Sequence, residues 1–334
     1  NPAFSVPSMF KLLGFHMGRM AVRLECSETD RDYTYYRERG WLESDYFYPV
    51  KLGLMKKVWG RLLDALATSR YGKSRGNPVE SVAEAYHPLA VDLEAGTEDG
   101  LPVRGWYVPS QNGAVVIALH GLGANRLQVV APVQPLLEQG YGLVLLDMRA
   151  HGNSGGDAYA PCLAVGDIRA VVGYLLEAEP DVRIGLLGYS SGGHTALCAA
   201  AQMAEVAAIF VDGVGFGQTS DAFDPVLPAI KPFLFTTPMN WMFFRFSDLF
   251  SGYHDERPVR ELVREIAPRP LYFVAAGGDP YEPGLAARYA ADAGPNASTW
   301  IVAGVGHCGA HSADPEEYGR RLLDFFDAAL PATP

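Results

Sequence analysis

The 334-residue sequence has few cysteines, no long apolar run and no excess of positive charge. Its four cysteines (Cys26, Cys162, Cys198 and Cys308) lie far apart, so we expect neither a metal motif nor a disulfide framework. The net charge of −11 argues against general nucleic-acid binding. No apolar stretch approaches the length of a membrane span, and internal repeats and low-complexity tracts are also missing.

The composition is that of a globular protein, with 49% apolar and 19% charged residues. Its 36 glycines and 24 prolines require frequent turns, which argues against a helical bundle. The length suits one large α/β domain or two smaller domains.

Charge is divided unevenly along the chain. Residues 1–80 carry a net charge of +4 and the remainder −15. A basic accessory segment beside an acidic domain is the simpler interpretation, and peripheral contact of residues 1–80 with an anionic membrane is the alternative. The cysteine usage favours a cytoplasmic protein. The chain begins with Asn1 rather than Met, which leaves room for an upstream signal or membrane anchor.

A Gly-, Ser- and Pro-containing stretch, Gly72–Pro78, is the clearest linker signal. Before it, Met9–Leu24 and Val50–Leu66 have helical apolar spacing. We therefore predict a helical N-terminal extension over residues 1–80 and a second domain over residues 81–334.

After the linker, short apolar runs alternate with helical segments. Continuous apolar runs indicate strands covered on both faces, so we predict an α/β fold with a mainly parallel, doubly wound sheet and an antiparallel opening pair. The predicted strands are His87–Glu94, Val103–Val108, Ala114–Leu119, Leu143–Asp147, Ile184–Gly188, Ala207–Asp212, Leu271–Ala275 and Ser298–Val302. The predicted helices are Val130–Gln139, Val165–Ala178, Gly192–Ala204, Gly284–Ala293 and Pro315–Leu330.

One interval, about 213–266, breaks this alternation and is rich in aromatic residues and prolines. Long insertions in compact domains commonly form lids or binding loops, although these aromatics could simply pack the insertion onto the domain. We predict a lid, and a substrate pocket that includes Tyr189, Phe216, Trp241 and Phe244.

The strongest motif is Gly188-Tyr189-Ser190-Ser191-Gly192, a G-x-S-x-G sequence between a predicted strand and an Ala-rich helix. A sharp turn there would raise the Ser190 hydroxyl above the sheet, and the helix N-terminus would favour a developing oxyanion. We predict that Ser190 is a nucleophile. Two backbone N–H groups should form an oxyanion hole, one from Ser191 and one from Leu122 after the third predicted strand.

A nucleophilic serine requires a base and a group that orients the base, and with this motif the chain order is serine, acid, histidine. Asp279 follows the strand Leu271–Ala275, and His307 follows the last predicted strand. We predict these two as acid and base, with Asp212 and His311 as the second choices. Cys308 is a rival nucleophile only in the absence of the serine motif.

Other chemistries fit less well. A dehalogenase or epoxide hydrolase would need Asp at position 190, and a dinucleotide-binding protein would need a third glycine after Gly121 and Gly123. His16 and His87 have no carboxylate or cysteine neighbour at ligand spacing, so we expect no metal.

These features resemble the α/β-hydrolase superfamily over roughly residues 85–330. The similarity rests on His120-Gly121, Asp147–Gly156, Gly188–Gly193, Pro268-Arg269-Pro270 and Gly306-His307. The chain looks most like serine esterases of the branch that contains dienelactone-hydrolase-like and prolyl-oligopeptidase-like catalytic domains. That branch usually has Gly where this chain has Ala150, a difference that concerns loop geometry.

The resemblance implies a triad of Ser190, Asp279 and His307, an acyl-enzyme intermediate and no cofactor. We predict a carboxylesterase-type serine hydrolase (EC 3.1.1 class) that prefers small-molecule esters with apolar or aromatic acyl or alcohol groups. The alternatives are a peptidase or amidase with the same triad and a non-catalytic ligand-binding protein. The sequence leaves the natural substrate, the oligomeric state and the role of residues 1–80 open.

Overall fold

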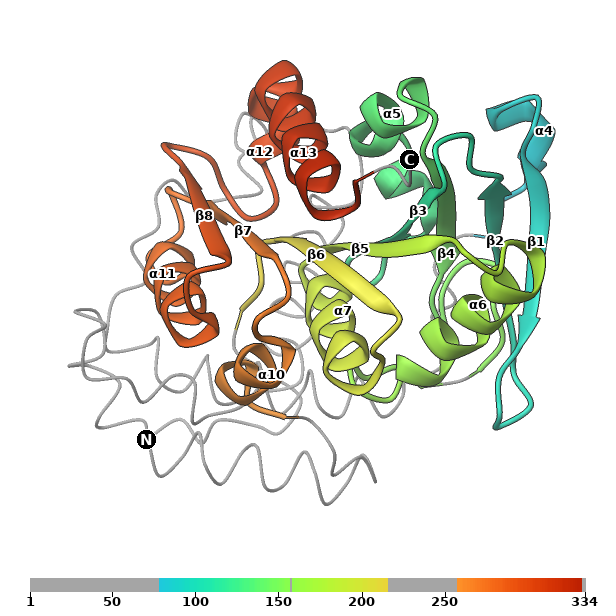
Figure 1. Ribbon diagram of the computed structural model, residues 1–334, viewed down its shortest axis with the longest axis horizontal. Helices are drawn as coiled ribbons and strands as arrows, with labels where there is room; N and C mark the ends of the chain where they lie inside the picture. The colour runs from blue at the N-terminus through green and yellow to red at the C-terminus, as the bar shows by residue number, and fades with distance from the viewer. Residues whose placement is uncertain (1–77, 157, 216–256, 332–334) are drawn as a thin grey trace, which may run out of the picture. The chain divides into compact units, whose positions relative to one another are not determined.

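The computed structural model describes residues 78–156, 158–215 and 257–331, which form a single sheet covered by helices on both faces (Figure 1). The sheet has eight strands in the order β1-β2-β4-β3-β5-β6-β7-β8. The strands are β1 (Val91–Gly96), β2 (Pro102–Val108), β3 (Ala114–Leu119), β4 (Gly142–Asp147), β5 (Arg183–Tyr189), β6 (Val206–Asp212), β7 (Leu271–Ala276) and β8 (Ala297–Val302).

Strand β2 pairs antiparallel with β1 and β4, and all other neighbouring strands pair parallel. The central strands β3 and β4 are buried at every residue, as continuous apolar runs predict. The predicted fold class is confirmed, and all eight predicted strands are present; seven have ends within one residue of the prediction, whereas the first, predicted as His87–Glu94, is observed as Val91–Gly96.

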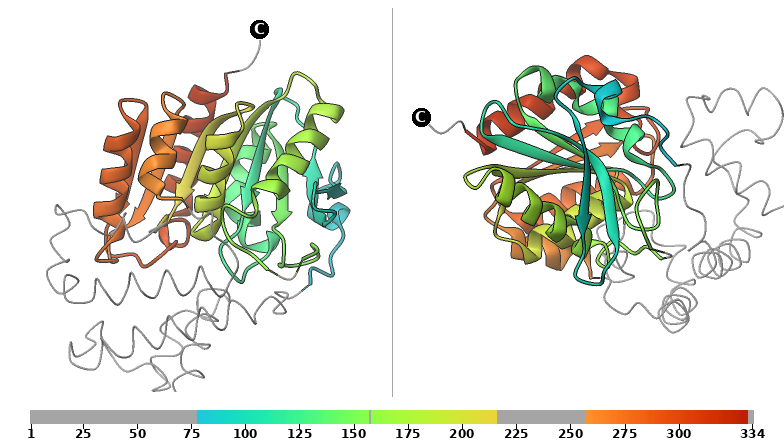
Figure 2. Two further views of the ribbon diagram at one scale, coloured as in Figure 1. Left: turned by 90° about the horizontal axis from the view of Figure 1, so that it is seen from below. Right: turned by 90° about the vertical axis from the view of Figure 1, so that its right-hand side faces the viewer.

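The helices form two layers (Figures 1 and 2). One face of the sheet carries α6 (Val165–Ala178), α7 (Ser191–Gln202), α10 (Val259–Ile266) and α11 (Glu282–Ala293). The other face carries α5 (Val130–Glu138), α12 (Ala310–Ala313) and α13 (Pro315–Ala329). Two short elements, α4 (Ala83–Tyr86) and the 3₁₀ helix η2 (Arg126–Val129), complete the described part of the chain.

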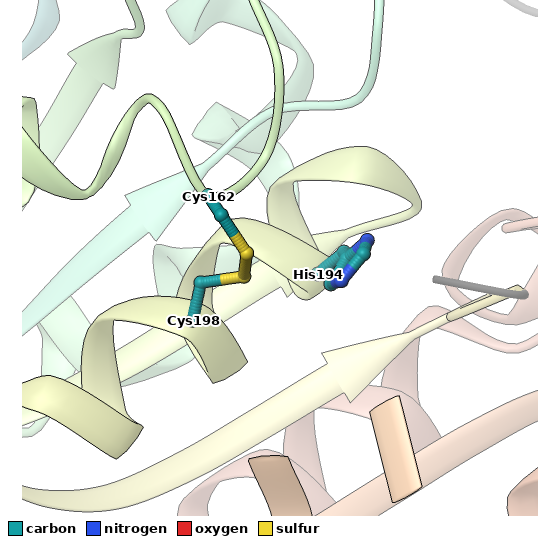
Figure 3. A group of neighbouring side chains, drawn as sticks. All are labelled: Cys162, His194 and Cys198. Carbon is teal, nitrogen blue, oxygen red and sulfur yellow. A yellow bond between two sulfur atoms is a disulfide. The ribbon is translucent and has the colours of Figure 1, made fainter. Parts of the chain in front are cut away.

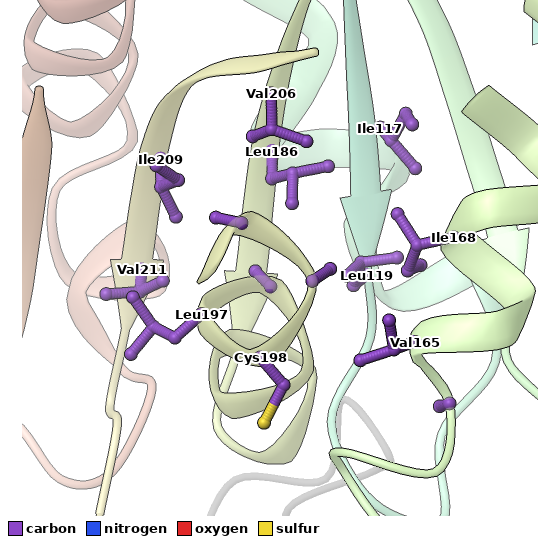
Figure 4. Close-up of a cluster of buried hydrophobic side chains, with 14 of the residues drawn as sticks. Ile117, Leu119, Val165, Ile168, Leu186, Leu197, Cys198, Val206, Ile209 and Val211 are labelled. Atoms are coloured by element: carbon purple, nitrogen blue, oxygen red, sulfur yellow. The ribbon is translucent and has the colours of Figure 1, made fainter. Parts of the chain in front are cut away.

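Each face of the sheet has its own hydrophobic core. The core under α6 and α7 includes Ile117, Leu119, Ile168, Leu186 and Leu197, all fully buried or nearly so (Figure 4). The second core, under α5 and α13, contains Phe210, Tyr318 and Phe326. Together the two cores hold β5 rigidly, and the residues that follow β5 begin the candidate site.

Two features of this domain differ from expectation. Helix α10 lies inside the interval assigned to the insertion, yet it packs against α7 and α11 as part of the core. A disulfide joins Cys162, in the turn before α6, to Cys198 in α7, although we expected no disulfide. The two cysteines are 36 residues apart in sequence, and only the packing of α6 beside α7 brings them together.

The N-terminal extension and most of the predicted lid, including Phe216, Trp241 and Phe244, lie outside the described residues. Within the described ranges, no helix has both the length and the apolar character needed to cross a membrane.

Candidate active site

Ser190 lies at the sharp turn between β5 and α7. Its backbone has φ 51° and ψ −115°, a conformation that non-glycine residues rarely adopt. Its N–H donates to the carbonyl of Asp212 at the end of β6, at 2.8 Å. The strained turn is thus fixed by the neighbouring strand and presents the hydroxyl at the carboxyl edge of the sheet.

The glycines on both sides of Ser190 are required by close packing. A Cβ at Gly188 would lie 2.5 Å from the carbonyl oxygen of Gly192, and one at Gly192 would lie 2.3 Å from that of His120. Neither contact is tolerable, because both involve backbone atoms. The motif therefore has these glycines because strand, turn and helix approach each other closely.

His307 reaches Ser190 from the loop after β8. Its Nε2 lies 2.9 Å from the Ser190 Oγ, a hydrogen-bond distance, and its side chain is 47% exposed. Space for the ring depends on Gly213, which has φ +72° and whose added Cβ would lie 2.9 Å from the ring Cε1. The sequence prediction of Ser190 and His307 as neighbours agrees with this geometry.

The carboxylate beside His307 is that of Glu282, and the prediction of Asp279 for this contact is wrong. Glu282 Oε1 lies 2.5 Å from His307 Nδ1. Asp279 instead accepts hydrogen bonds from the backbone N–H groups of Tyr281 and Glu282, at 2.8 and 3.0 Å. Its carboxylate thereby closes the turn that leads into α11.

Glu282 is held at both oxygens. Oε2 accepts the N–H of Ala276 at the end of β7, at 2.8 Å, while Oε1 faces the imidazole. The side chain is 7% exposed. The prediction began α11 at Gly284, so Glu282 was treated as part of the loop; in the structure it is the first helical residue. Pro283 directly after it, a proline in the first helical turn, is the signal that could have placed the helix start correctly.

The electrostatics favour protonation of His307. Burial lowers the pKa of His307, but the hydrogen bond and charge of Glu282, with the charges of Asp212 and Asp279, outweigh burial and raise its pKa above the usual value of 6.5. A histidine with this environment can accept a proton and hold it while the adjacent carboxylate stabilises the imidazolium.

Asp212, the second-choice acid, lies close behind the same histidine without taking the contact. It is 1% exposed, and no donor in the described part of the chain reaches its Oδ2. Burial, together with the negative charge of Glu282, raises the pKa of Asp212 to about 7. The structure thus places one hydrogen-bonded carboxylate and one buried, sparsely bonded carboxylate beside His307.

Of the two predicted oxyanion-hole residues, Ser191 directly follows Ser190, and Leu122 follows Gly121 in a loop close to it. Ser191 is the first residue of α7, so its N–H has no acceptor within the helix. The loop of Leu122 passes close by, since a Cβ on Gly121 would lie 3.6 Å from the Ser190 Cβ. Within the described residues, neighbouring N–H groups are occupied: Gly121 donates to Gln128 Oε1 at 2.7 Å, and Gly123 donates to His151 Nε2 at 3.0 Å.

The loop after β4 supports this arrangement through Asp147. Its carboxylate accepts from the Arg126 backbone and guanidinium and from the N–H of Asn153, all between 2.7 and 3.1 Å. Arg126 and Asp147 are buried, so the pair fixes the start of η2 rather than forming a surface ion pair. Arg126 and Gln128 were not singled out in the sequence, because their role depends on contacts between distant loops. Ala150, where the family usually has Gly, has φ 61°.

The rival residues are placed away from the reacting position. Burial raises the pKa of the Cys308 thiol well above its usual value, and its Sγ faces the carbonyl oxygen of Asp212 at 3.5 Å. The ring of His311 packs edge-on against Tyr318.

Tyr189, which we predicted in the substrate pocket, is 3% exposed and donates its hydroxyl to Tyr318 at 2.6 Å. The pocket prediction for Tyr189 is therefore wrong, because its side chain points into the core beneath the turn.

A family model described as "Alpha/beta hydrolase family" matches residues 115–321, which is more than half of the sequence. The chain belongs to the alpha/beta hydrolase family. The hydrolase is also 27% identical over 284 residues to an uncharacterized protein of Mycobacterium tuberculosis, covering 82% of this chain and 89% of that protein. It is 32% identical over 143 residues to the polyketide transferase ATR5 of Stachybotrys chlorohalonatus, covering 40% of this chain but only 47% of the transferase.

Solved structures share the fold of the hydrolase. The esterase Pf2001 of Pyrococcus furiosus superposes with a TM-score of 0.60 at 24% identity, over 77% of this chain and 98% of the esterase. A dienelactone hydrolase of Anabaena variabilis gives a TM-score of 0.52 at 13% identity, over 72% of this chain and 98% of its own.

Proposed function

We propose that this hydrolase is a serine esterase that cleaves carboxylic esters through an acyl-enzyme intermediate. The observation that carries the proposal is the continuous chain of contacts from the Ser190 hydroxyl to the His307 imidazole and on to the Glu282 carboxylate. Nucleophile, base and orienting acid come from three different loops at one edge of the sheet. This constellation is the one that acyl transfer by a serine requires.

In the first step, His307 Nε2 takes the hydroxyl proton while Ser190 Oγ attacks the ester carbonyl carbon. Glu282 holds the imidazole by Nδ1 and stabilises its charge, without itself taking the proton. The tetrahedral intermediate collapses as the imidazolium gives its proton to the departing alcohol. Water then attacks the acyl-enzyme with His307 again as base, which releases the carboxylic acid and restores Ser190.

The N–H groups of Leu122 and Ser191 are the proposed donors to the oxyanion. Two features support the proposal: Ser191 begins α7, whose N-terminus carries the positive end of the helix dipole, and the loop that contains Leu122 comes close to Ser190 at Gly121. Removing one such donor typically costs about 10²–10³-fold in kcat, so together they supply a large part of the rate.

The likeness of the fold to that of solved esterases supports the proposal of an ester substrate. We expect apolar or aromatic acyl or alcohol groups, on the basis of the aromatic residues in the insertion at about 213–266. A peptidase or amidase would use the same residues, and so would a transferase that passes the acyl group to an acceptor other than water.

The test combines a fluorophosphonate probe with a substrate panel on the full chain. We expect the probe to label Ser190, and Ser190→Ala to lose labelling and about 10⁶-fold in kcat. Esters of increasing chain length, aminoacyl anilides and added alcohol acceptors separate esterase, amidase and transferase activities. Labelling elsewhere, or an active Ser190→Ala variant, would overturn the serine mechanism; faster cleavage of anilides would overturn the ester assignment.

A further inference from the structure

Within the described residues, one group of three side chains outside the proposed active site has the composition of a metal site. Cys162, His194 and Cys198 place one potential ligand atom each within 4.8 Å of the other two (Figure 3). Two sulfurs and one imidazole nitrogen form a donor set that suits zinc and other soft divalent cations.

The fold fixes the positions of all three ligands. His194 and Cys198 are four residues apart on α7, so their side chains project from the same face of the helix. Cys162 approaches from the turn before α6, with its Cα 5.3 Å from that of Cys198. The site is thus built on a rigid helix and closed by one residue from a neighbouring loop.

The spacing of the ligand atoms is compatible with coordination. A tetrahedral zinc ion bonded at about 2.0–2.3 Å holds its ligand atoms about 3.3–3.8 Å apart. The ligand atoms here lie within 4.8 Å of one another, and the two sulfurs are bonded to each other, so after reduction the cysteine side chains have to rotate apart to bind one ion. Cys198 and His194 are buried and Cys162 is partly exposed, so a cation would enter from the side of the loop.

The disulfide determines when such a site can exist. A disulfide sulfur is not a thiolate and does not hold zinc as one, so the oxidised chain lacks two of the three ligands (Figure 3). Reduction by a dithiol supplies two electrons and two protons, converts the bridge to two thiols and leaves the dithiol as its own disulfide. A zinc ion that binds both sulfurs displaces the two thiol protons.

We propose that Cys162, His194 and Cys198 form a redox-gated site that binds a soft divalent cation such as zinc only when the Cys162–Cys198 disulfide is reduced. The three side chains occupy three positions of a tetrahedral ion and leave the fourth to water. In an oxidising compartment the same residues act as a covalent link between the α6 turn and α7. This inference is independent of the esterase proposal.

The experiment measures zinc bound per chain after anaerobic reduction, removal of the reductant and equilibrium dialysis, with the oxidised chain in parallel. We expect one zinc per reduced chain and none at the same free zinc concentration for the oxidised chain. Zinc should also raise the melting temperature of the reduced chain alone, because it binds only that folded form. Equal zinc binding by both forms, or no binding by the reduced form, would overturn the proposal without any substitution.

Variants then assign the ligands. His194→Asn should weaken zinc binding by about tenfold or more, since loss even of residues that support metal ligands costs about 10–100-fold. Cys162→Ser should do the same and weaken the thiolate-to-metal absorption band seen when cobalt replaces zinc, because only the Cys198 thiolate remains. Cys26→Ser is the matched control and should bind zinc like the parent chain. If all three variants bind zinc equally, the ion lies elsewhere and the assignment is wrong.

Discussion

Two carboxylates lie near His307, one at the end of β6 and one at the start of α11 after β7, and their surroundings differ. After β7, Glu282 has an N–H donor on one oxygen and the imidazole on the other. After β6, Asp212 is buried with an oxygen that no donor in the described part of the chain reaches, and its pKa rises to about 7. Burial and the negative charge of Glu282 raise the pKa of Asp212, so this carboxyl keeps its proton to a higher pH than an exposed aspartate does.

The difference has a mechanistic meaning. Two fully ionised carboxylates beside one imidazole would repel each other and would hold the proton on His307 too strongly. Because the pKa of Asp212 is raised to about 7, its carboxyl carries less than a full negative charge near neutral pH, which limits this repulsion. Two positions that look alike as acids at strand ends therefore take different roles.

The largest expected effect comes from neutralising the carboxylate after β7. Glu282→Gln should lower kcat on esters by about 10³–10⁴-fold, because an amide no longer stabilises the imidazolium and favours the wrong tautomer. Steady-state kinetics with a fast ester measure the loss. Asp279→Asn is the control and should stay within about tenfold of the parent; the opposite ranking would restore Asp279 as the acid.

Neutralising the carboxylate after β6 should change stability more than rate. In the folded chain the pKa of Asp212 is raised to about 7, so between about pH 4 and 7 the unfolded chain releases a proton that the folded chain keeps. Stability contributed by the protonated group is therefore lost as pH rises through this window. Asp212→Asn has no group that titrates here, so it does not lose this stability. From about pH 4 to 7 the free energy of unfolding of the variant should therefore rise, relative to that of the parent, by on the order of a few kcal/mol.

Urea unfolding of parent and Asp212→Asn chains at pH 4.5 and 8 measures this gain. The exposed Asp92 on β1 offers the matched control, Asp92→Asn, which should follow the parent at both pH values. If the stability of Asp212→Asn changes with pH as that of the parent does, the pKa of Asp212 is not raised in the folded chain. The difference drawn here between Asp212 and Glu282 would then be wrong.

The pH dependence of catalysis tests how strongly Glu282 raises the pKa of His307. Because Glu282 and the nearby aspartates raise the pKa of His307, the acidic limb of kcat/KM should have its midpoint above pH 6.5 and fall tenfold per pH unit below it. Glu282→Gln should move that midpoint downward, since burial alone lowers the pKa. A midpoint that stays in place after this substitution would assign the limb to another group.

The smallest change in stability is expected from a substitution of Asp279, in the turn between β7 and α11. Asp279→Ala removes the acceptor of two backbone N–H groups and should destabilise the chain by about 0.5–2 kcal/mol while leaving the Glu282 contact largely intact. Asp314→Ala, at the start of α13, removes a comparable cap, in which Asp314 accepts the N–H of Glu317 at 3.0 Å. Thermal unfolding should give similar losses for both variants, and a much larger loss of kcat for Asp279→Ala would contradict a purely structural role.

The sequence allowed Ser190 and His307 to be predicted because their signals are local. The G-x-S-x-G pattern can be recognised in a short segment between a strand and a helix, although Gly192 is required by a contact with His120, and the strand order places His307 at the same edge. The acid was misassigned because Asp279 and Glu282 are three residues apart in one turn. Which of them reaches the imidazole depends on where α11 begins and on the side-chain hydrogen bonds of that turn.

Longer-range features could not be derived in this way. The Cys162–Cys198 bridge and the Arg126–Asp147 pair each join segments that meet only after the sheet and helices have packed. Tyr189 was misplaced because a residue beside a nucleophile is a reasonable pocket residue until the direction of its side chain is known. Ala150, by contrast, has φ 61°, in the left-handed region that glycine adopts readily. This agrees with the expectation that alanine in place of the family's usual glycine at this position concerns loop geometry.

Gly213 is required by the packing of the site rather than by its chemistry. It has no functional side chain, yet any side chain there would press on the ring of His307 and on the Cys308 sulfur, 2.9 and 2.7 Å from an added Cβ. In a saturation library selected for hydrolysis, this glycine should tolerate as few substitutions as the residues that handle protons. A search for improved variants would do better to leave position 213 fixed and diversify elsewhere.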